Sequence, residues 1–147
     1  MSSEDLVEQL VSLHGEEGVC PTADDWRGIL AVDGRVVLLN LLAFVHYVDV
    51  YAGPRNGALE YSEYRQAVGP AFLRAGGREL YFGEVGHRFG TSEPQRWDAA
   101  VLTRYPSARA LAGMWLDPEF VAAHRSRVDG VAESQVRSSC RSRISRP

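Results

Sequence analysis

His87 and Asp98 lie on either side of a polar loop that joins two predicted strands, and together they could act as a general base. If the turn is centred on Ser92-Glu93, the two residues pair across it and their side chains share one face of the sheet. A carboxylate beside an imidazole orients the ring and raises its basicity, which suits proton abstraction near neutral pH. A register shifted by one residue separates them and leaves an exposed His87 and a structural Asp98. The sequence leaves both arrangements open.

Asn40 is the second candidate, because it interrupts an apolar segment between Leu39 and Leu41. An amide buried there without a hydrogen-bond partner would cost about 1–3 kcal/mol. The partner could belong to a neighbouring loop, which makes Asn40 structural. It could instead be the carbonyl or oxyanion of a ligand, which makes Asn40 catalytic.

Tyr61 and Tyr64 fall on the apolar side of a predicted helix over residues 58–75. Buried tyrosines at such positions usually belong to the core, with hydroxyls that reach a polar edge. The same side chains could line a pocket between helix and sheet, where Tyr64 would offer a proton and Tyr61 would contact the substrate. The two roles are compatible.

A further set of residues is predicted to hold the substrate. Arg104 and Asp98 occupy even positions of one strand and so share a face, where Arg104 would pair with Asp98 or with an acidic ligand. Trp97, Tyr105 and Met114 are predicted to form the wall of the pocket and to contact the substrate.

Composition excludes several classes of function. The 147-residue chain has a net charge of −3, which argues against general nucleic-acid binding because that binding relies on a positive surface. All sixteen basic residues are arginine, so a lysine Schiff base is excluded. The four histidines lack metal-ligand spacing, and Cys20 and Cys140 form neither a disulfide framework nor a metal site. We therefore expect neither a metal nor a cofactor.

The sequence also predicts no membrane segment. Its longest apolar run, residues 36–45, is too short to span a bilayer, and no charged-then-apolar signal peptide begins the chain. A cytoplasmic location is therefore expected.

The elements that would position the candidate residues follow a β-α-β-β-α-β order. Their apolar patterns and turn residues place them at residues 35–44, 58–75, 78–89, 97–105, 107–116 and 128–137. Residues 46–56 are predicted to be irregular because they contain Gly53-Pro54. A helical piece over residues 119–127 precedes the last strand.

Three parts of the chain are distinguished. Two predicted helices form an N-terminal helical extension over residues 1–34. Residues 35–137 are predicted to form an α+β, ferredoxin-like domain in which helices cover one face of a four-stranded antiparallel sheet. The other face needs a cover, and a second copy of the chain is the simplest one, which predicts an isologous homodimer. Residues 138–147 are rich in Arg and Ser and are predicted to be a disordered tail.

An ordered set of motifs points to a known family. In chain order they are NLLAF (residues 40–44), Gly57-x-x-x-Tyr61-x-x-Tyr64, Gly76-Gly77-Arg78, Trp97-Asp98, Arg104-Tyr105-Pro106-Ser107, Met114, Asp117-Pro118 and Arg127-x-x-Gly130. As a set they resemble the domain-of-unknown-function family thirteen-thirty over roughly residues 35–137. The resemblance implies the dimeric α/β-barrel superfamily, in which two ferredoxin-like sheets pair into a barrel.

The chain departs from that family's pattern at two positions. Phe120 stands where the family often has Tyr, and Ser126 stands where it often has His, so no role of those side chains carries over. Superfamily relatives include cofactor-free monooxygenases, lactone isomerases, polyketide cyclases and haem enzymes. The implied fold therefore constrains the function only weakly.

The residues favour a small cofactor-free enzyme that acts on a hydrophobic, oxygen-bearing small molecule, as in bacterial secondary metabolism. His87 or a tyrosine would move the proton and Asn40 or Arg104 would hold the anion, in an isomerisation, cyclisation, hydrolysis or decarboxylation. The alternative is a non-catalytic homodimer that binds a small ligand or a protein partner. Convergence of the polar candidates on one cavity would favour the enzyme, and their dispersal would favour the alternative.

Overall fold

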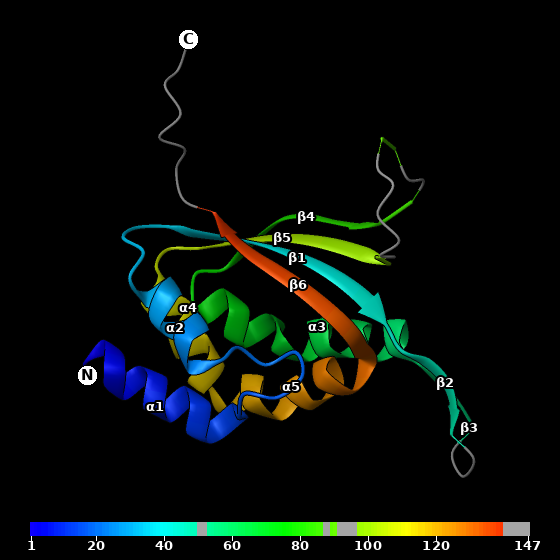
Figure 1. Cartoon of the computed structure of the whole chain (residues 1–147), viewed down its shortest axis with the longest axis horizontal. Helices are drawn as coiled ribbons and strands as arrows, with labels where there is room; N and C mark the ends of the chain where they lie inside the picture. Colours follow the sequence, from blue (N-terminus) through cyan, green and yellow to red (C-terminus); the bar gives the residue numbers. More distant parts are fainter. Residues whose placement is uncertain (50–52, 87–88, 91–96, 140–147) are drawn as a thin grey trace.

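The computed structural model describes residues 1–49, 53–86, 89–90 and 97–139. Within these residues, helices cover one face of an antiparallel sheet whose strands lie in the order β4-β5-β1-β6 (Figure 1). The strands are β1 (Val36–Phe44), β4 (Arg78–Glu84), β5 (Ala99–Tyr105) and β6 (Val131–Ser139). The predicted α+β class and the antiparallel pairing are confirmed.

Strands β1 and β5 lie side by side and alternate between two environments, as the two-residue period of a strand requires. In β5 the odd-numbered residues, such as Val101 and Thr103, are buried, whereas the even-numbered residues are partly exposed. In β1, Val36 and Leu42 are fully buried. Because Asn40 lies two residues from Leu42 and pairs in register with Val101, it belongs to the helix-covered face.

The opposite face of the sheet stays partly open. Leu39 is 38% exposed and Tyr81 is 56% exposed. In register, Tyr81 pairs with Leu102 and Leu102 pairs with Leu39, so three apolar residues form a row across β4, β5 and β1. Within the described residues of one chain, this face therefore lacks the cover expected from the sequence. The homodimer that would supply the cover stays a prediction.

Three helices lie against the covered face, and they are α3 (Gly57–Arg74), α4 (Ala108–Leu116) and α5 (Pro118–Gly130) (Figure 1). A side-chain oxygen caps the start of two of them, where backbone N–H groups have no partner inside the helix. Asn56 Oδ1 accepts hydrogen bonds from the first turn of α3. Ser107 Oγ accepts one from Ala110 N at 3.0 Å, as the predicted cap of α4 requires.

The N-terminal extension contains the two predicted helices, α1 (Ser3–His14) and α2 (Ala23–Leu30). Each begins with a capping box, in which the cap and the third helical residue exchange hydrogen bonds. Leu10 and Trp26 are buried in the same hydrophobic core as the helices of the domain. The rings of Trp26 and Trp115 meet edge to face at 5.3 Å between centroids. The extension therefore shares the core of the domain.

One segment predicted to be irregular is a small sheet. Strands β2 (His46–Asp49) and β3 (Gly53–Asn56) pair antiparallel, so the prediction for residues 46–56 was wrong outside residues 50–52, which lie beyond the described residues. Gly53-Pro54 is compatible with this pairing because both strands of a two-stranded ribbon are edges, and edge strands tolerate Pro.

Two other strands end at residues different from those predicted. Strand β4 ends at Glu84, earlier than the predicted residue 89, and β6 continues to Ser139 beyond the predicted residue 137. The predicted tail therefore loses its first two residues to β6. Its remainder, residues 140–147, lies outside the described residues.

Asp117 joins α3 to the junction between α4 and α5. Its Oδ1 accepts a hydrogen bond from Glu119 N at 3.0 Å, and its Oδ2 lies 2.9 Å from Arg74 Nη2 at the end of α3. The same guanidinium lies 2.9 Å from Glu119 Oε2. Arg74, with a smaller effect of the Glu119 N–H, lowers the pKa of Asp117 below its ordinary value.

We expect Asp117 to make the stability of the protein sensitive to acid. Because its pKa is lower in the folded than in the unfolded state, its carboxylate stabilises the fold above the unfolded pKa of about 4. That contribution is lost as the pH falls through the folded pKa. Asp117→Asn keeps a side-chain oxygen for the Glu119 N–H but removes the charge. Urea denaturation between about pH 6 and pH 2 should show a shallower acid loss of stability for the variant. Parallel curves would contradict this role.

Candidate functional site

A cavity of about 490 Å³ lies between α3, α4 and the helix-covered face of β1 and β5. Most of its wall is apolar, and the main contributors are Leu38, Val68, Phe72, Val101, Leu111 and Met114. The size and the lining are those of ordinary small-molecule sites, which occupy roughly 300–1,000 Å³ and place a few polar groups on apolar walls.

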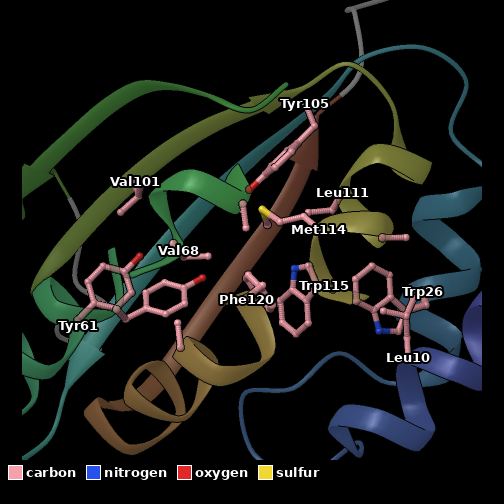
Figure 2. Packing of buried hydrophobic residues seen from close by; sticks show 14 of the residues in the cluster. Leu10, Trp26, Tyr61, Val68, Val101, Tyr105, Leu111, Met114, Trp115 and Phe120 are labelled. Atoms are coloured by element: carbon pink, nitrogen blue, oxygen red, sulfur yellow. The ribbon is translucent and has the colours of Figure 1, made fainter. Parts of the chain in front are cut away.

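Three tyrosines line this cavity. Tyr61 and Tyr64 come from α3 and their ring centroids lie 5.5 Å apart, whereas Tyr105 comes from the end of β5. Figure 2 shows Tyr61 and Tyr105 at opposite ends of the buried cluster, at the lower left and the upper right of the view. All three are largely buried. The core role and the pocket role foreseen for Tyr61 and Tyr64 therefore coincide.

Asn40 lines the cavity from β1. Its Nδ2 donates a long hydrogen bond, 3.4 Å, to Val101 O of the neighbouring strand. The structural partner is thus a strand carbonyl and not the loop considered from the sequence. At this length the bond is weak, so the amide can turn toward a ligand without leaving a strong interaction.

Thr103 is a polar cavity residue that sequence reasoning missed. It is 9% exposed and lies on the inward face of β5 with Val101 and Tyr105. Its Oγ1 is buried and has no hydrogen-bond partner within the described part of the chain. The alternation of β5 could have placed Thr103 inward, but it could not show that its hydroxyl lacks a partner.

Two charged residues lie at the solvent-exposed edge of the cavity. Arg65 of α3 and Glu79 of β4 form an ion pair, and both side chains are about one-third exposed or more. The Arg65 guanidinium also lies 3.7 Å from the ring centroid of Phe82, a favourable cation–π distance. These contacts hold Arg65 in place and leave its charge balanced by Glu79.

Asp98 takes a structural position outside the cavity. Its Oδ2 accepts a hydrogen bond from Phe44 N at 2.8 Å, and its own N–H donates to Leu42 O at 2.8 Å. Val85 N donates to Asp98 O, so Val85 lies opposite Asp98. The register that would place His87 opposite Asp98, one of the two arrangements that the sequence left open, is therefore not the one formed. His87 itself lies outside the described residues, so its chemical role stays a prediction.

Arg104 lies on the open face of the sheet, away from the cavity. It pairs across strands with Val37 on one side and Arg78 on the other. The predicted pairing of Arg104 with Asp98 is wrong, because six residues of extended strand separate them by about 20 Å. Shared parity placed both on one face but did not bring them into contact.

The predicted pocket wall is present in part. Tyr105 and Met114 line the cavity, whereas Trp97 is half-buried and does not. Of the predicted site residues, Asn40, Tyr61, Tyr64, Tyr105 and Met114 thus converge.

A second polar cluster connects the extension to the domain. His14 Nε2 lies 2.7 Å from Trp115 O, and Cys20 Sγ lies 3.6 Å from His124 Nε2.

Over the described residues, no group of three or more His, Cys, Asp or Glu side chains could hold a metal ion. None of the helices in the described part of the chain combines the length and the apolar character that crossing a membrane requires.

No protein-family model matches the chain, and no curated protein matches it. Among solved structures it is similar to RPA0582, a protein of unknown function from Rhodopseudomonas palustris, with 26% identity and a TM-score of 0.72 over 81% of this chain and 92% of that one. The methylated form of RPA0582 gives 23% identity and a TM-score of 0.76, covering 88% and 98%. A dimeric protein of unknown function with a ferredoxin-like fold, from Bacteroides fragilis, gives 13% identity and a TM-score of 0.50, covering 71% and 94%.

These similarities concern the fold. They support the predicted ferredoxin-like fold. The narrower resemblance to family thirteen-thirty is not confirmed, because no family model matches. The similar proteins are themselves of unknown function, so they give no indication of an activity.

Proposed function

We propose that this protein binds a hydrophobic, oxygen-bearing small molecule in the cavity between α3, α4 and the sheet. One observation carries the proposal: a cavity of about 490 Å³ with mostly apolar walls, whose lining residues also include an asparagine, three tyrosines and a threonine. Apolar walls supply affinity and a few polar groups supply orientation, which is how small-molecule sites generally work. Aromatic walls suit a ligand of one or a few flat rings.

Catalysis is the second candidate function. It is favoured by Tyr64 and Asn40, which line the same cavity. The Tyr64 hydroxyl would transfer a proton and the Asn40 amide would donate a hydrogen bond to the oxyanion that develops, without a cofactor. Asp98 and Arg104 lie outside the cavity, which makes binding the better supported of the two functions. Catalysis would require that the ligand is released chemically changed.

We also propose that the protein works as a cytoplasmic homodimer, joined through the open face of its sheet. The apolar row across β4, β5 and β1 supports this assembly, as does the dimeric protein of similar fold. The net charge of −3 gives no support to a nucleic-acid partner.

Gly69→Leu tests the cavity. Gly69 lines it from α3, and a Cβ atom built there meets no heavy atom within 4 Å. A leucine can therefore occupy the ligand's space. Because residue 69 precedes Pro70, where a Cβ atom disfavours helical backbone, we expect a modest loss of thermal stability in a variant that still folds. With 2-naphthol as the probe in equilibrium dialysis, we expect binding to weaken about tenfold or more, with circular dichroism to check the fold.

Gly113→Leu is the matched control. Gly113 lies in α4, is exposed, does not line the cavity, and also has open space at the Cβ position. We expect this variant to bind 2-naphthol like the unaltered protein. Equal binding by the Gly69 variant, or no binding by the unaltered protein, would contradict the proposed site.

A further inference from the structure

We propose that Thr103 is the residue that recognises the ligand's oxygen, and that the ligand presents there a neutral hydroxyl or carbonyl instead of an acid group. This inference rests on the proposed function of the cavity and names the chemistry of its polar end.

Thr103 belongs to the lining of the cavity and lies on the inward face of β5. Its hydroxyl oxygen is itself buried and has no hydrogen-bond partner within the described residues. A buried hydroxyl without a partner is unfavourable, because it has left water and gained nothing in exchange. Valine has nearly the same shape and would not carry this penalty. A threonine at this position is explained if a ligand completes its hydrogen bond.

The neighbours of Thr103 across the sheet do not satisfy its hydroxyl. In register it pairs with Leu38 of β1, which is apolar, and with Glu79 of β4. The Glu79 carboxylate is engaged instead by Arg65. Because Thr103 lines the cavity, a ligand there can reach its hydroxyl after a rotation about χ1.

Asn40 adds a second polar group to the same place. It pairs with Val101, two residues before Thr103, so Asn40 and Thr103 are diagonal neighbours on one face of the sheet. A hydroxyl can donate and accept, and an amide offers both an N–H donor and a carbonyl acceptor. Together they match a ligand hydroxyl, which needs one donor and one acceptor, or a carbonyl, which needs donors alone.

The charges of the cavity indicate that this ligand group is neutral. Among the described lining residues, the charged ones are Arg65 and Glu79, and they neutralise each other at the exposed edge. A carboxylate placed beside Thr103 would therefore be desolvated without a counter-charge, which is strongly unfavourable. Phenols and hydroxyketones avoid this cost because they are uncharged at neutral pH.

The test uses three ligands of one shape: 2-naphthol, 2-methylnaphthalene and 2-naphthoate. Equilibrium dialysis at pH 7 gives the affinity of each for the unaltered protein and for Thr103→Val and Thr103→Ser. We expect 2-naphthol to bind the unaltered protein about tenfold more tightly than 2-methylnaphthalene, and 2-naphthoate to bind most weakly. Thr103→Val should remove the advantage of the hydroxyl and leave 2-methylnaphthalene unchanged. Thr103→Ser should retain most of that advantage.

Thermal unfolding without ligand distinguishes a purely structural role of Thr103 from a role in ligand recognition. Because valine removes an unsatisfied hydroxyl, Thr103→Val should melt no lower than the unaltered protein, and a clear loss of stability would overturn the inference. Equal binding of 2-naphthol and 2-methylnaphthalene would overturn it while leaving the cavity proposal intact. Tightest binding of 2-naphthoate would overturn the neutral ligand class. Failure of all three ligands would overturn the proposed function and, with it, this inference.

Discussion

Replacing Phe120 with alanine is expected to destabilise the protein by about 3–5 kcal/mol. Phe120 belongs to α5, is fully buried, and is the largest of the fully buried side chains. Removing a whole ring deletes its transfer free energy and leaves a cavity that the surrounding structure fills only in part. Since small domains are stable by only about 5–15 kcal/mol, the loss is a large fraction of the total.

The position of Phe120 explains why the surroundings should relax poorly. Its ring centroid lies 4.8 Å from that of Trp115 in α4, 6.2 Å from Tyr64 in α3 and 6.1 Å from His14 in α1. Figure 2 shows Phe120, Trp115 and Trp26 in succession between the helices of the domain and the extension. One ring thus joins three helices and the extension, and none of them can move into the space alone.

Urea denaturation followed by tryptophan fluorescence measures the effect, and Phe89→Ala is its control. Phe89 is the same side chain at 95% exposure, so its truncation should change the free energy of unfolding by no more than about 0.5 kcal/mol. A loss below about 1.5 kcal/mol for Phe120→Ala would mean that the aromatic cluster repacks and does not join the extension to the domain.

The helices could be predicted closely because the signals that start them are local. A cap such as Ser107, a following apolar stripe and a stop such as Asp117-Pro118 all lie within a few residues, and the structure places α4 between them. The extension shows the same, since both of its helices begin with capping boxes readable in the sequence. What the sequence did not reveal is that the extension contributes Leu10 and Trp26 to the core of the domain, because that depends on packing between distant segments.

The candidate site could be predicted only in part, for the same reason. Spacing along a helix is local, so Tyr61 and Tyr64 could be placed on the inward side of their helix, and Asn40 could be placed within an apolar strand. Register is not local, and the hairpin brings Val85 and not His87 opposite Asp98. Whether a buried polar group finds a hydrogen-bond partner is harder still to predict, because it depends on all of its neighbours in the folded chain. The Thr103 hydroxyl is therefore visible only in the folded chain.

The open face of the sheet leads to the second large effect, the loss of dimerisation in Leu39→Arg. Leu39 lies at the β1 end of the apolar row that also contains Leu102 and Tyr81. If two such faces meet, an arginine in the row would place an unpaired charge inside an apolar interface, at a cost of several kcal/mol in each protomer. In a single chain the same arginine reaches water, because Leu39 is 38% exposed. The variant should therefore fold and fail to pair.

Sedimentation equilibrium at micromolar concentration gives the assembly directly. We expect twice the mass of the chain for the unaltered protein and the mass of one chain for Leu39→Arg, with circular dichroism showing the same fold for both. Leu59→Arg is the control, since Leu59 is 59% exposed but belongs to α3 in the helical layer, and it should stay dimeric. A Leu39→Arg protein that remains dimeric would place the interface elsewhere, and a monomeric unaltered protein would rule out the homodimer. Dimerisation is independent of the ligand site, because the row lies on the face of the sheet opposite Asn40 and Thr103. The binding of 2-naphthol should therefore survive in the monomer.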